Sequence, residues 1–279
     1  MADIKVLGKV FNGVSKLHMQ NASGEGTTEF SVGGGSNETL KKLIDRSITS
    51  IDMSGLGLTE IGRSAFERCS DLTNITIPSG ITKIRDRAFF ACNSLASIII
   101  PDSVTEFYAQ SLHDCTSLTH VRANGAITRM ATGSFTSEGL AQFPMSLLSA
   151  RFPYMITDSS NPITTLFGGS SAGNACKLLQ LVDLGSASSI TTNAFGNCQA
   201  LTVLILRKSD SICTLGNVNS FSSTPFRGYN SQTGTIYVPS SLIDTYKAAS
   251  NWKTIFDEGY LTFSALETSP YANPDFVLS

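Results

Sequence analysis

The stretch "LTNITIPSGITKIRDRAFFACNSLASIIIPDSVTEFYAQSLHDCTSLTHV", residues 72–121, carries one pattern twice and begins it a third time. The period is 23 residues, and several positions of each unit keep in step. In three consecutive units these positions hold Ile61, Ile84 and Phe107; Ala65, Ala88 and Ser111; Phe66, Phe89 and Leu112; Cys69, Cys92 and Cys115; Leu72, Leu95 and Leu118; and Ile75, Ile98 and Val121. A fixed period of this length is typical of stacked repeat architectures.

One such unit is too short to bury its own apolar face, so we expect successive units to stack into a solenoid. In "LTNITIP", the alternation of Ile75 and Ile77 with Thr76 is typical of a half-buried strand, and the proline ends it because proline cannot donate to the ladder. "GITKI" indicates a second short strand. "RDRAFFAC" is too short for an independent helix and is interpreted as a turn whose Ala, Phe and Cys fill the coil.

The repeat is interrupted in the middle of the chain. A fourth unit begins at Met130, the pattern is lost over 138–166, and it resumes at Phe167 and Ile190. In the unit that begins at Phe167, the apolar positions are assigned to Leu178 and Leu181. Because 37 residues separate Met130 from Phe167, we expect one unit to hold a loop-rich insertion near 138–166. A last partial match, "TIYVP", ends at Pro239.

The string I-x-x-x-A-F-x-x-C-x-x-L-x-x-I-x-I-P-x-x-[IV]-T resembles the BspA-type leucine-rich repeat, which is common in bacterial surface proteins and in phages of gut bacteria. The resemblance covers about residues 48–239, with the break at 138–166. Beyond the repeats, "LILRKSDSICTL" and "GTIYVPSSLIDTYKAASNWKTI" are similar to the C-terminal end of family members encoded by gut phages and prophages. The resemblance implies a β-rich leucine-rich-repeat solenoid with 23-residue repeats.

Solenoids need a cover over each terminal coil, and atypical sequence occupies both ends. Residues 36–239 are predicted to form the solenoid, opened by a capping helix in "SNETLKKLIDRS". Residues 240–279 are predicted to form a helical cap, in which Trp252 packs in the core, and a tail that trails over the surface. Residues 1–35 read as short strands with Gly turns, a small N-terminal β module suited to attachment.

Charge and hydropathy exclude several classes of partner. The formal net charge is −2 and charged residues make up 15% of the chain, so nothing indicates a nucleic-acid surface. No apolar run is long enough to insert in a membrane, and Met1–Gln20 lacks a signal-peptide core. The chain is therefore expected to be made in the host cytoplasm.

The repeat cysteines raise the question of disulfides, since equivalent positions in stacked coils lie about 5 Å apart. They belong to the inward set with Ala and Leu, so we predict reduced, buried thiols. Serine in place of Cys92 is then expected to cost more than alanine, because a buried hydroxyl needs a partner. Cys176 and Cys213 fall off the repeat register, and their role stays open.

The sequence supports no catalytic, cofactor or metal site. "GSSAG", residues 169–173, matches the G-x-S-x-G pattern of a nucleophilic serine, but no histidine follows His120. The three histidines are dispersed along the repeats, and no phosphate-binding loop is present. We therefore predict that the chain is not an enzyme.

What remains is the outward surface of the strands. Two outward columns are read from the period: Asn74, Ser97, His120, Gln180 and Val203, and beside them Thr76, Ile99, Arg122, Val182 and Ile205. The apolar members are unusual on a solvated face and are typical of partner contact. An equally weighted alternative is that they lie beneath the 138–166 insertion.

These observations favour a binding or structural protein. The favoured reading is a phage virion component of the tail or surface, in which residues 1–35 bind other virion proteins and the solenoid contacts a host-surface protein or glycan. The alternative is an adhesin-like or prophage-encoded interaction protein that binds protein or glycan. A homo-oligomer is compatible with both.

Overall fold

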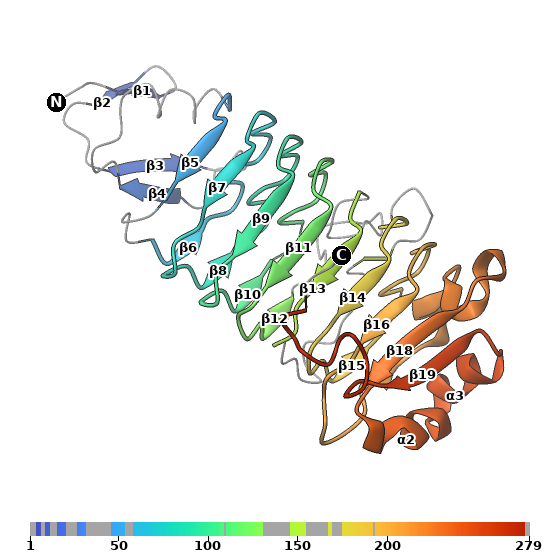
Figure 1. The fold of residues 1–279 in the computed structure, drawn as a ribbon. Helices are drawn as coiled ribbons and strands as arrows, with labels where there is room; N and C mark the ends of the chain where they lie inside the picture. The colour runs from blue at the N-terminus through green and yellow to red at the C-terminus, as the bar shows by residue number, and fades with distance from the viewer. Residues whose placement is uncertain are drawn as a thin grey trace.

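The computed structural model describes residues 4–6, 9–11, 16–20, 27–31, 46–53, 58–108, 110–130, 146–154, 167–168, 175–191 and 193–276; of those before residue 46, it describes the backbone. From residue 46 onward, the chain winds in successive coils whose strands lie side by side along an elongated stack (Figure 1). Every strand pairing in this stack is parallel, as expected where each coil repeats the path of the one before.

The longer strands make one row. They are β5 (Ser50–Asp52), β7 (Asn74–Thr76), β9 (Ser97–Ile100), β11 (His120–Ala123), β13 (Ser149–Arg151), β14 (Leu181–Asp183), β16 (Val203–Ile205), β18 (Gly234–Val238) and β19 (Leu261–Ala265). β5 and β7 form one parallel pair, and β9 to β19 form a seven-stranded sheet. We call the outward side of this row, away from the core, the outer face.

Two-residue strands make a second row. They are β6 (Glu60–Ile61), β8 (Lys83–Ile84), β10 (Glu106–Phe107), β12 (Arg129–Met130), β15 (Ser189–Ile190) and β17 (Thr214–Leu215). β6 to β12 form one sheet and β15 pairs with β17. The two strands per coil that the repeat predicts, one before the proline and one after it, are therefore present.

The "AFFAC"-type segment is a turn, as predicted, and it hydrogen-bonds from coil to coil. Phe66 N–H donates to the carbonyl of Ala88 and Phe89 N–H to that of Ser111, at 2.7 and 2.8 Å. Two residues of each such turn have positive φ, for example Arg87 at 55° and Ala91 at 57°. Left-handed backbone at these two points reverses the chain tightly enough to exclude an α-helical turn.

Apolar side chains stack along the axis of the solenoid. Phe66 lies on Phe89 with ring centroids 5.4 Å apart, and Phe195 lies between Phe167 and Phe221 at 5.6 and 5.2 Å. Stacked rings and the buried Leu and Ile ladders form a continuous core that no single coil possesses.

All six cysteines are free and buried, which confirms the prediction of reduced thiols. The thiol of Cys92 donates to the carbonyl of Phe66 in the preceding coil at 3.0 Å, and Cys115 donates likewise to Phe89. Burial raises the pKa of the Cys69 thiol to about 12, so it stays protonated. Cys176 is in register after all, because Leu179 N–H bonds its carbonyl as Leu118 N–H bonds that of Cys115.

The expectation that 138–166 is only a loop-rich insertion is wrong for residues 146–154. β13 lies between β11 and β14, and Ala150 pairs with Val121 on one side and Val182 on the other. Leu147, Ala150 and Phe152 are fully buried. This segment is therefore a strand of the sheet between two enlarged coils, 29 and 32 residues long by these pairings. The rest of 138–166 lies outside the described residues.

Short helices follow β18 at the C-terminal end of the stack (Figure 1). They are η5 (Ser240–Leu242), α2 (Ile243–Ala248) and α3 (Ser250–Asp257), preceded between β17 and β18 by η2 (Val218–Phe221), η3 (Pro225–Arg227) and η4 (Tyr229–Ser231). Trp252 is buried, as predicted, and its indole N–H donates to the carbonyl of Cys213 at 2.7 Å. Tyr246 accepts from the N–H of the same cysteine at 2.8 Å. The final strand of the sheet, β19, was not predicted.

Near the N-terminus, the backbone forms two antiparallel pairs. β1 (Ile4–Val6) pairs with β2 (Lys9–Phe11), and β3 (Lys16–Gln20) pairs with β4 (Thr27–Ser31). Short strands were expected here, whereas their use as an attachment module stays a prediction. The capping helix predicted in "SNETLKKLIDRS" falls largely on residues outside the described part of the chain.

Candidate binding face

The first half of the outer face has the columns that the period predicts. Ser97 pairs with His120 and Ile99 with Arg122, so each column runs straight across β9 and β11. On β7, Asn74 and Thr76 are exposed on either side of the buried Ile75. Six of the ten predicted residues therefore point outward as expected: Asn74, Thr76, Ser97, Ile99, His120 and Arg122.

The prediction was one residue out of register at β14. Leu181 pairs with Val203 and Asp183 with Ile205, so Leu181 and Asp183 occupy the two columns. Val182 points into the core and is fully buried, whereas Gln180 is exposed but precedes the strand. Leu178, assigned to an apolar position, is 51% exposed, and Leu179 fills the core instead.

The slip arises in the turn that follows β14. The coil from Val182 to Leu204 has 22 residues, one fewer than the 23 from Ile98 to Val121. Its turn contains Gly185 with φ of 52°, a left-handed conformation that glycine adopts without steric cost. The repeat turn after β9 is "PDS" between Ile100 and Val104, and here "GS" between Leu184 and Ala187 spans the same corner.

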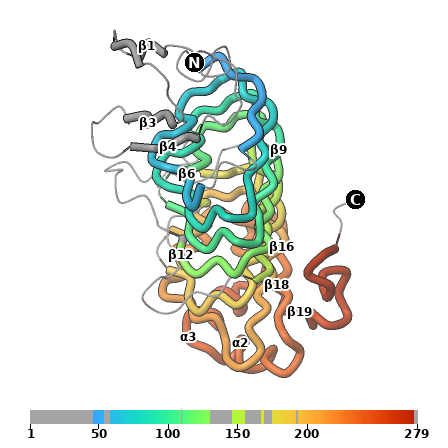
Figure 2. Tube along the Cα trace, turned by 90° about the vertical axis from the view of Figure 1, so that its left-hand side faces the viewer, coloured from blue at the N-terminus to red at the C-terminus, as the bar shows by residue number. Residues whose placement is uncertain are grey.

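The C-terminal segment 266–276, which we call the tail, covers the apolar part of the outer face. Leu181, Ile205 and Leu266 form one buried cluster, and Val203, Tyr237, Tyr271 and Phe276 pack against it. Figure 2 shows the last part of the chain standing outside the row of long strands. Among the described residues, then, neither the insertion nor an open surface accounts for Val203 and Ile205; the chain's own tail covers them.

Three arginines hold the tail to the sheet. Arg151 donates to the carbonyl of Pro274 at 3.0 Å and lies 3.7 Å from the centroid of the Phe276 ring. Arg207 donates to the carbonyl of Tyr271 at 3.0 Å, and Arg122 pairs with Asp275. Burial, together with Arg122 and Arg207, lowers the pKa of the Arg151 guanidinium.

The carboxylate beneath these arginines is Asp183, which is fully buried. Arg207 donates to it from Nη2 at 2.7 Å and from Nε at 2.9 Å, and the N–H of Gly185 adds a third bond at 3.0 Å. Burial raises the pKa of this carboxyl, and the hydrogen bonds from Arg207 oppose the rise. Asp183 therefore ties β14, the turn after β16 and, through Arg207, the tail.

The part of the outer face on β7, β9 and β11 remains open, and we call it the open face: Asn74, Thr76, Ser97, Ile99, His120 and Arg122. Ile99 is 82% exposed, the highest value of any large apolar side chain in the described residues. Its neighbours across the strands are Thr76 and Arg122. A single bare isoleucine among hydrogen-bonding side chains offers a contact point for a macromolecule rather than an enclosed site for a small substrate.

The chemistry available at this face is limited. His120 Nδ1 lies 2.8 Å from the hydroxyl of Ser149, the first two members of a nucleophilic dyad. No described carboxylate bonds His120, and the pair lies on an open sheet without a surrounding cleft. Ser171 of "GSSAG" falls outside the described residues. No group of three His, Cys, Asp or Glu within the described segments is placed to hold a metal ion.

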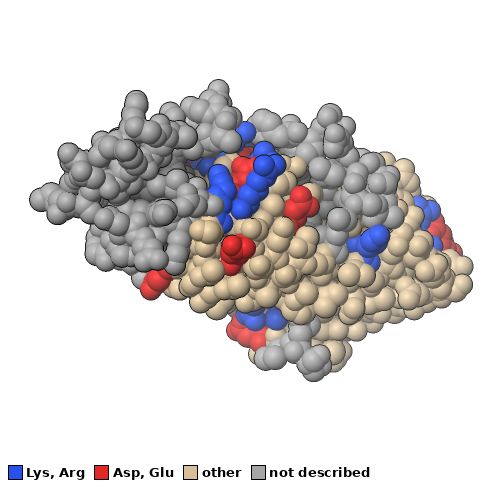
Figure 3. Space-filling model, turned by 90° about the horizontal axis from the view of Figure 1, so that it is seen from above, with Lys and Arg blue, Asp and Glu red and all other residues tan. Residues whose placement is uncertain are grey.

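Charges on the second row of strands are paired across coils. Arg85 bonds Glu60 at 3.0 Å, Lys83 bonds Glu106 at 3.0 Å, and Tyr108 lies between Arg85 and Arg129. Viewed from above Figure 1, positive and negative groups stand close together on a largely uncharged described surface (Figure 3). No described helix has the length and apolar character to cross a bilayer.

Comparisons with known proteins agree with this architecture. Residues 43–155 match the family model of the BspA type leucine rich repeat region, in six copies. No curated protein matches the sequence.

Three solved structures are similar, all at low identity. A leucine-rich repeat protein from Bacteroides ovatus is 19% identical, with 71% of this chain and 45% of that chain covered and a TM-score of 0.42. The T. pallidum leucine rich repeat protein is 20% identical, with 90% and 97% covered and a TM-score of 0.45. A leucine rich cell surface protein from Faecalibacterium prausnitzii is 17% identical, with 77% and 64% covered and a TM-score of 0.28. The chain spans less than half the length of the B. ovatus protein. By its family match and its rows of parallel strands, the chain has a leucine-rich repeat fold with a BspA-type repeat region at residues 43–155.

Proposed function

We propose that this chain is a non-enzymatic recognition protein that binds a macromolecular partner through the open face. The observation that carries the proposal is Ile99, which stays 82% exposed although the apolar residues farther along the same face are covered by the tail. Apolar surface that a fold leaves bare beside surface that it covers is typical of a contact site. A BspA-type repeat region, whose stacked coils present rows of variable side chains, suits this use.

The finer part of the proposal is a place in a phage virion, as a tail or surface component. Its support is the similarity of "LILRKSDSICTL" and "GTIYVPSSLIDTYKAASNWKTI" to the C-terminal end of phage-encoded family members. In this arrangement, residues 1–35 attach to other virion proteins and the solenoid faces a host-surface protein or glycan. The alternative is a bacterial or prophage-encoded interaction protein.

Purification of particles from a culture that expresses the chain separates these two origins. A virion component cosediments with intact particles at constant stoichiometry, and a variant lacking residues 1–35 is absent from them while its far-UV circular dichroism still shows the folded solenoid. Recovery of the chain only in the soluble or cell-envelope fraction would refute the virion assignment.

The open face is tested with a charged substitution and a matched control. Ile99→Glu places a charge at the centre of the face, and Leu178→Glu makes the same change at an exposed leucine outside it. With fluorescently labelled protein and whole bacterial cells as the probe, we expect Ile99→Glu to lose cell binding and Leu178→Glu to keep it. Equal binding by both variants would contradict the role of the open face.

A further inference from the structure

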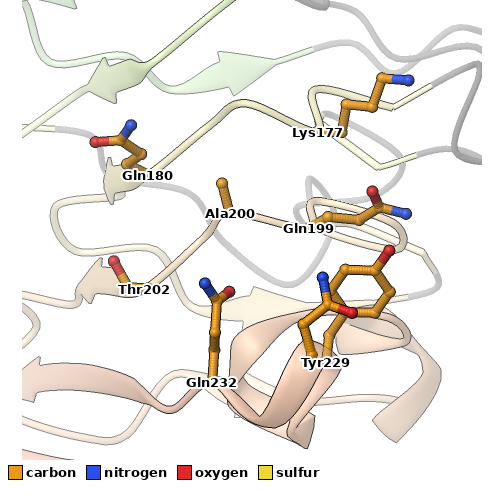
Figure 4. Close-up of a pocket in the computed structure, with 8 residues that line it drawn as sticks. Lys177, Gln180, Gln199, Ala200, Thr202, Tyr229 and Gln232 are labelled. Carbon is orange, nitrogen blue, oxygen red and sulfur yellow. The ribbon is translucent and has the colours of Figure 1, made fainter.

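A hollow of about 380 Å³ lies away from the open face, where β14, β16 and β18 begin. Its lining comes from two turns and from η4: Lys177, Gln180, Gln199, Ala200, Thr202, Tyr229, Asn230 and Gln232. Figure 4 shows Gln180, Thr202 and Gln232 towards one end, Lys177, Gln199 and Tyr229 towards the other, and Ala200 between them. This volume lies within the range of small-ligand sites.

The side chains of this hollow depart from the repeat. After the repeat cysteine, the regular coils place the short residues Ser70, Asn93 and Thr116, whereas the hollow has Lys177 and Gln199. Immediately before the long strand, the regular coils place Thr73, Ala96 and Thr119, and here the residue before β14 is Gln180. Coil stacking requires nothing long at either position, so these side chains are not explained by the fold.

The wall of the hollow also comes from an enlarged coil. Leu204 and Ile236 pair across 32 residues, whereas Ile98 and Val121 pair across 23. The added residues form the segment around η4, in which Gly228, Asn230 and Ser231 have φ of 73°, 53° and 58°. Additions to single repeats often build binding surfaces, and successive left-handed residues mark a backbone held in place for a use beyond chain reversal.

The geometry points to a saccharide-binding site in this hollow. Four side-chain amides, a threonine hydroxyl and a lysine ammonium converge, and none of them is hydrogen-bonded to another described side chain. Each amide both donates and accepts, which matches the paired donor and acceptor character of neighbouring sugar hydroxyls. The ring of Tyr229 adds an apolar surface with a polar tip, suited to the C–H face of a pyranose.

The lining selects among ligand classes. It contains no carboxylate, which disfavours cationic ligands, and one ammonium, from Lys177, which tolerates neutral or acidic sugars. Apart from Ala200 and the Tyr229 ring it offers no apolar pocket of the kind that anchors peptide side chains. The inference stands on residues outside the open face, so it does not depend on the virion assignment.

A printed array of neutral hexose, N-acetylhexosamine and sialylated glycans, probed with the labelled full chain, tests the assignment. We expect binding to at least one of these glycan classes, and titration with that glycan should show affinity about tenfold weaker for Gln180→Ala combined with Gln232→Ala, and for Tyr229→Ala. Gln180 and Gln232 are exposed, so the double variant should retain the native melting temperature. Ile99→Glu, which alters only the open face, is the matched control and should bind the glycan as the native chain does.

Three outcomes would overturn the assignment. The array shows no signal above background; the hollow variants bind the glycan as strongly as the native chain; or a peptide array gives binding that the hollow variants lose, which would make the occupant a protein segment. Loss of glycan binding by Ile99→Glu alone would move the sugar contact to the open face and would equally refute the hollow.

Discussion

Arg207→Met is expected to lower the free energy of unfolding by about 3–5 kcal/mol, because it leaves a carboxylate buried without its cation. Asp183 has 0% of its side chain exposed and Arg207 has 11%, so water screens the pair little. After the substitution, the backbone N–H of Gly185 is the one donor left of those that bond the carboxylate in the native fold. The loss of the bond from Arg207 to the tail carbonyl of Tyr271 adds to the effect.

The matched control is Arg122→Met, which also removes a guanidinium that touches the tail. Its partner Asp275 has 60% of its side chain exposed, so the pair is solvated and should contribute no more than about 1 kcal/mol. Urea denaturation followed by circular dichroism gives both values, provided that the slope with denaturant is unchanged. The two arginine variants should then differ by several-fold in their cost.

Two further measurements separate a buried charge from lost packing. Asp183→Asn in the Arg207→Met background removes the orphaned charge and should recover at least half of the deficit. The pH dependence has a definite sign: an unpaired buried carboxyl has a raised pKa, so its neutral form is compatible with the fold below about pH 4 and the deficit grows as the pH rises towards 7. An Arg207→Met variant that costs no more than Arg122→Met, or a deficit that is flat with pH, would refute this account of Asp183.

Three other variants test separate parts of the fold. A chain ending at Glu267 lacks most of the tail, so the patch around Leu181 and Ile205 is uncovered; binding of the dye ANS should rise while the far-UV spectrum stays native, and unchanged dye binding would mean that the tail does not cover the patch. Cys92→Ala should cost about 1–2 kcal/mol from a small cavity and an unpaired Phe66 carbonyl, and Cys92→Ser should cost less by thermal denaturation, because its hydroxyl finds that carbonyl, the reverse of the order expected from sequence. Burial lowers the pKa of His113, so the folded chain prefers the neutral ring; its contribution is complete above the unfolded pKa of about 6.5 and is lost as the pH falls below it, and His113→Gln should flatten the stability profile between pH 5 and 7.5.

The regular coils could be predicted from sequence because one local rule is repeated. Ile75, Phe89 and Cys115 are each buried where the 23-residue period puts them, and the proline marks the end of each longer strand. A coil that repeats its neighbour's path needs the same inward side chains at the same spacing, so agreement between units fixes both the strands and the core. The same reasoning placed Ile99 and His120 outward before any coordinates were known.

The period failed where backbone geometry, and not side-chain pattern, sets the length of a coil. Gly185 shortens one turn by a residue, and every position assigned by counting across that turn slips, which exchanges Val182 for Asp183 on the outer face. β13 escaped notice because its apolar positions are Leu147, Ala150 and Phe152 without the proline or the plug turn that mark other coils. A spacing search that allowed 22 residues would have recovered Asp183; the strand would have needed the fold.

The tail had no signal in its own sequence, because its partners lie far away along the chain. Tyr271 packs against Tyr237, and Asp275 reaches Arg122, 153 residues earlier. "TSPYANPDF" has two prolines and no periodicity, and read locally it predicts a loose end. The one available indication was indirect: Ile205 at an outward position requires a cover, and sequence alone does not say which segment supplies it.

The tail also explains why recognition is assigned to only part of a continuous sheet. β14, β16 and β18 place Leu181, Ile205 and Tyr237 outward, and these side chains would form an apolar stripe exposed to water if the chain ended at β19. The tail covers that stripe and ends beside Arg122, which belongs to both surfaces: it pairs with Asp275 of the tail and stands next to Ile99 in the column. A partner seated on Ile99 therefore meets the end of the tail at its rim, and the carboxylate of Asp275 neutralises the cation that would otherwise flank the apolar contact. Because the hollow beside η4 lies at the other end of the covered strands, the tail separates the two proposed sites, and ligands of different chemistry can occupy them without competing for the same side chains.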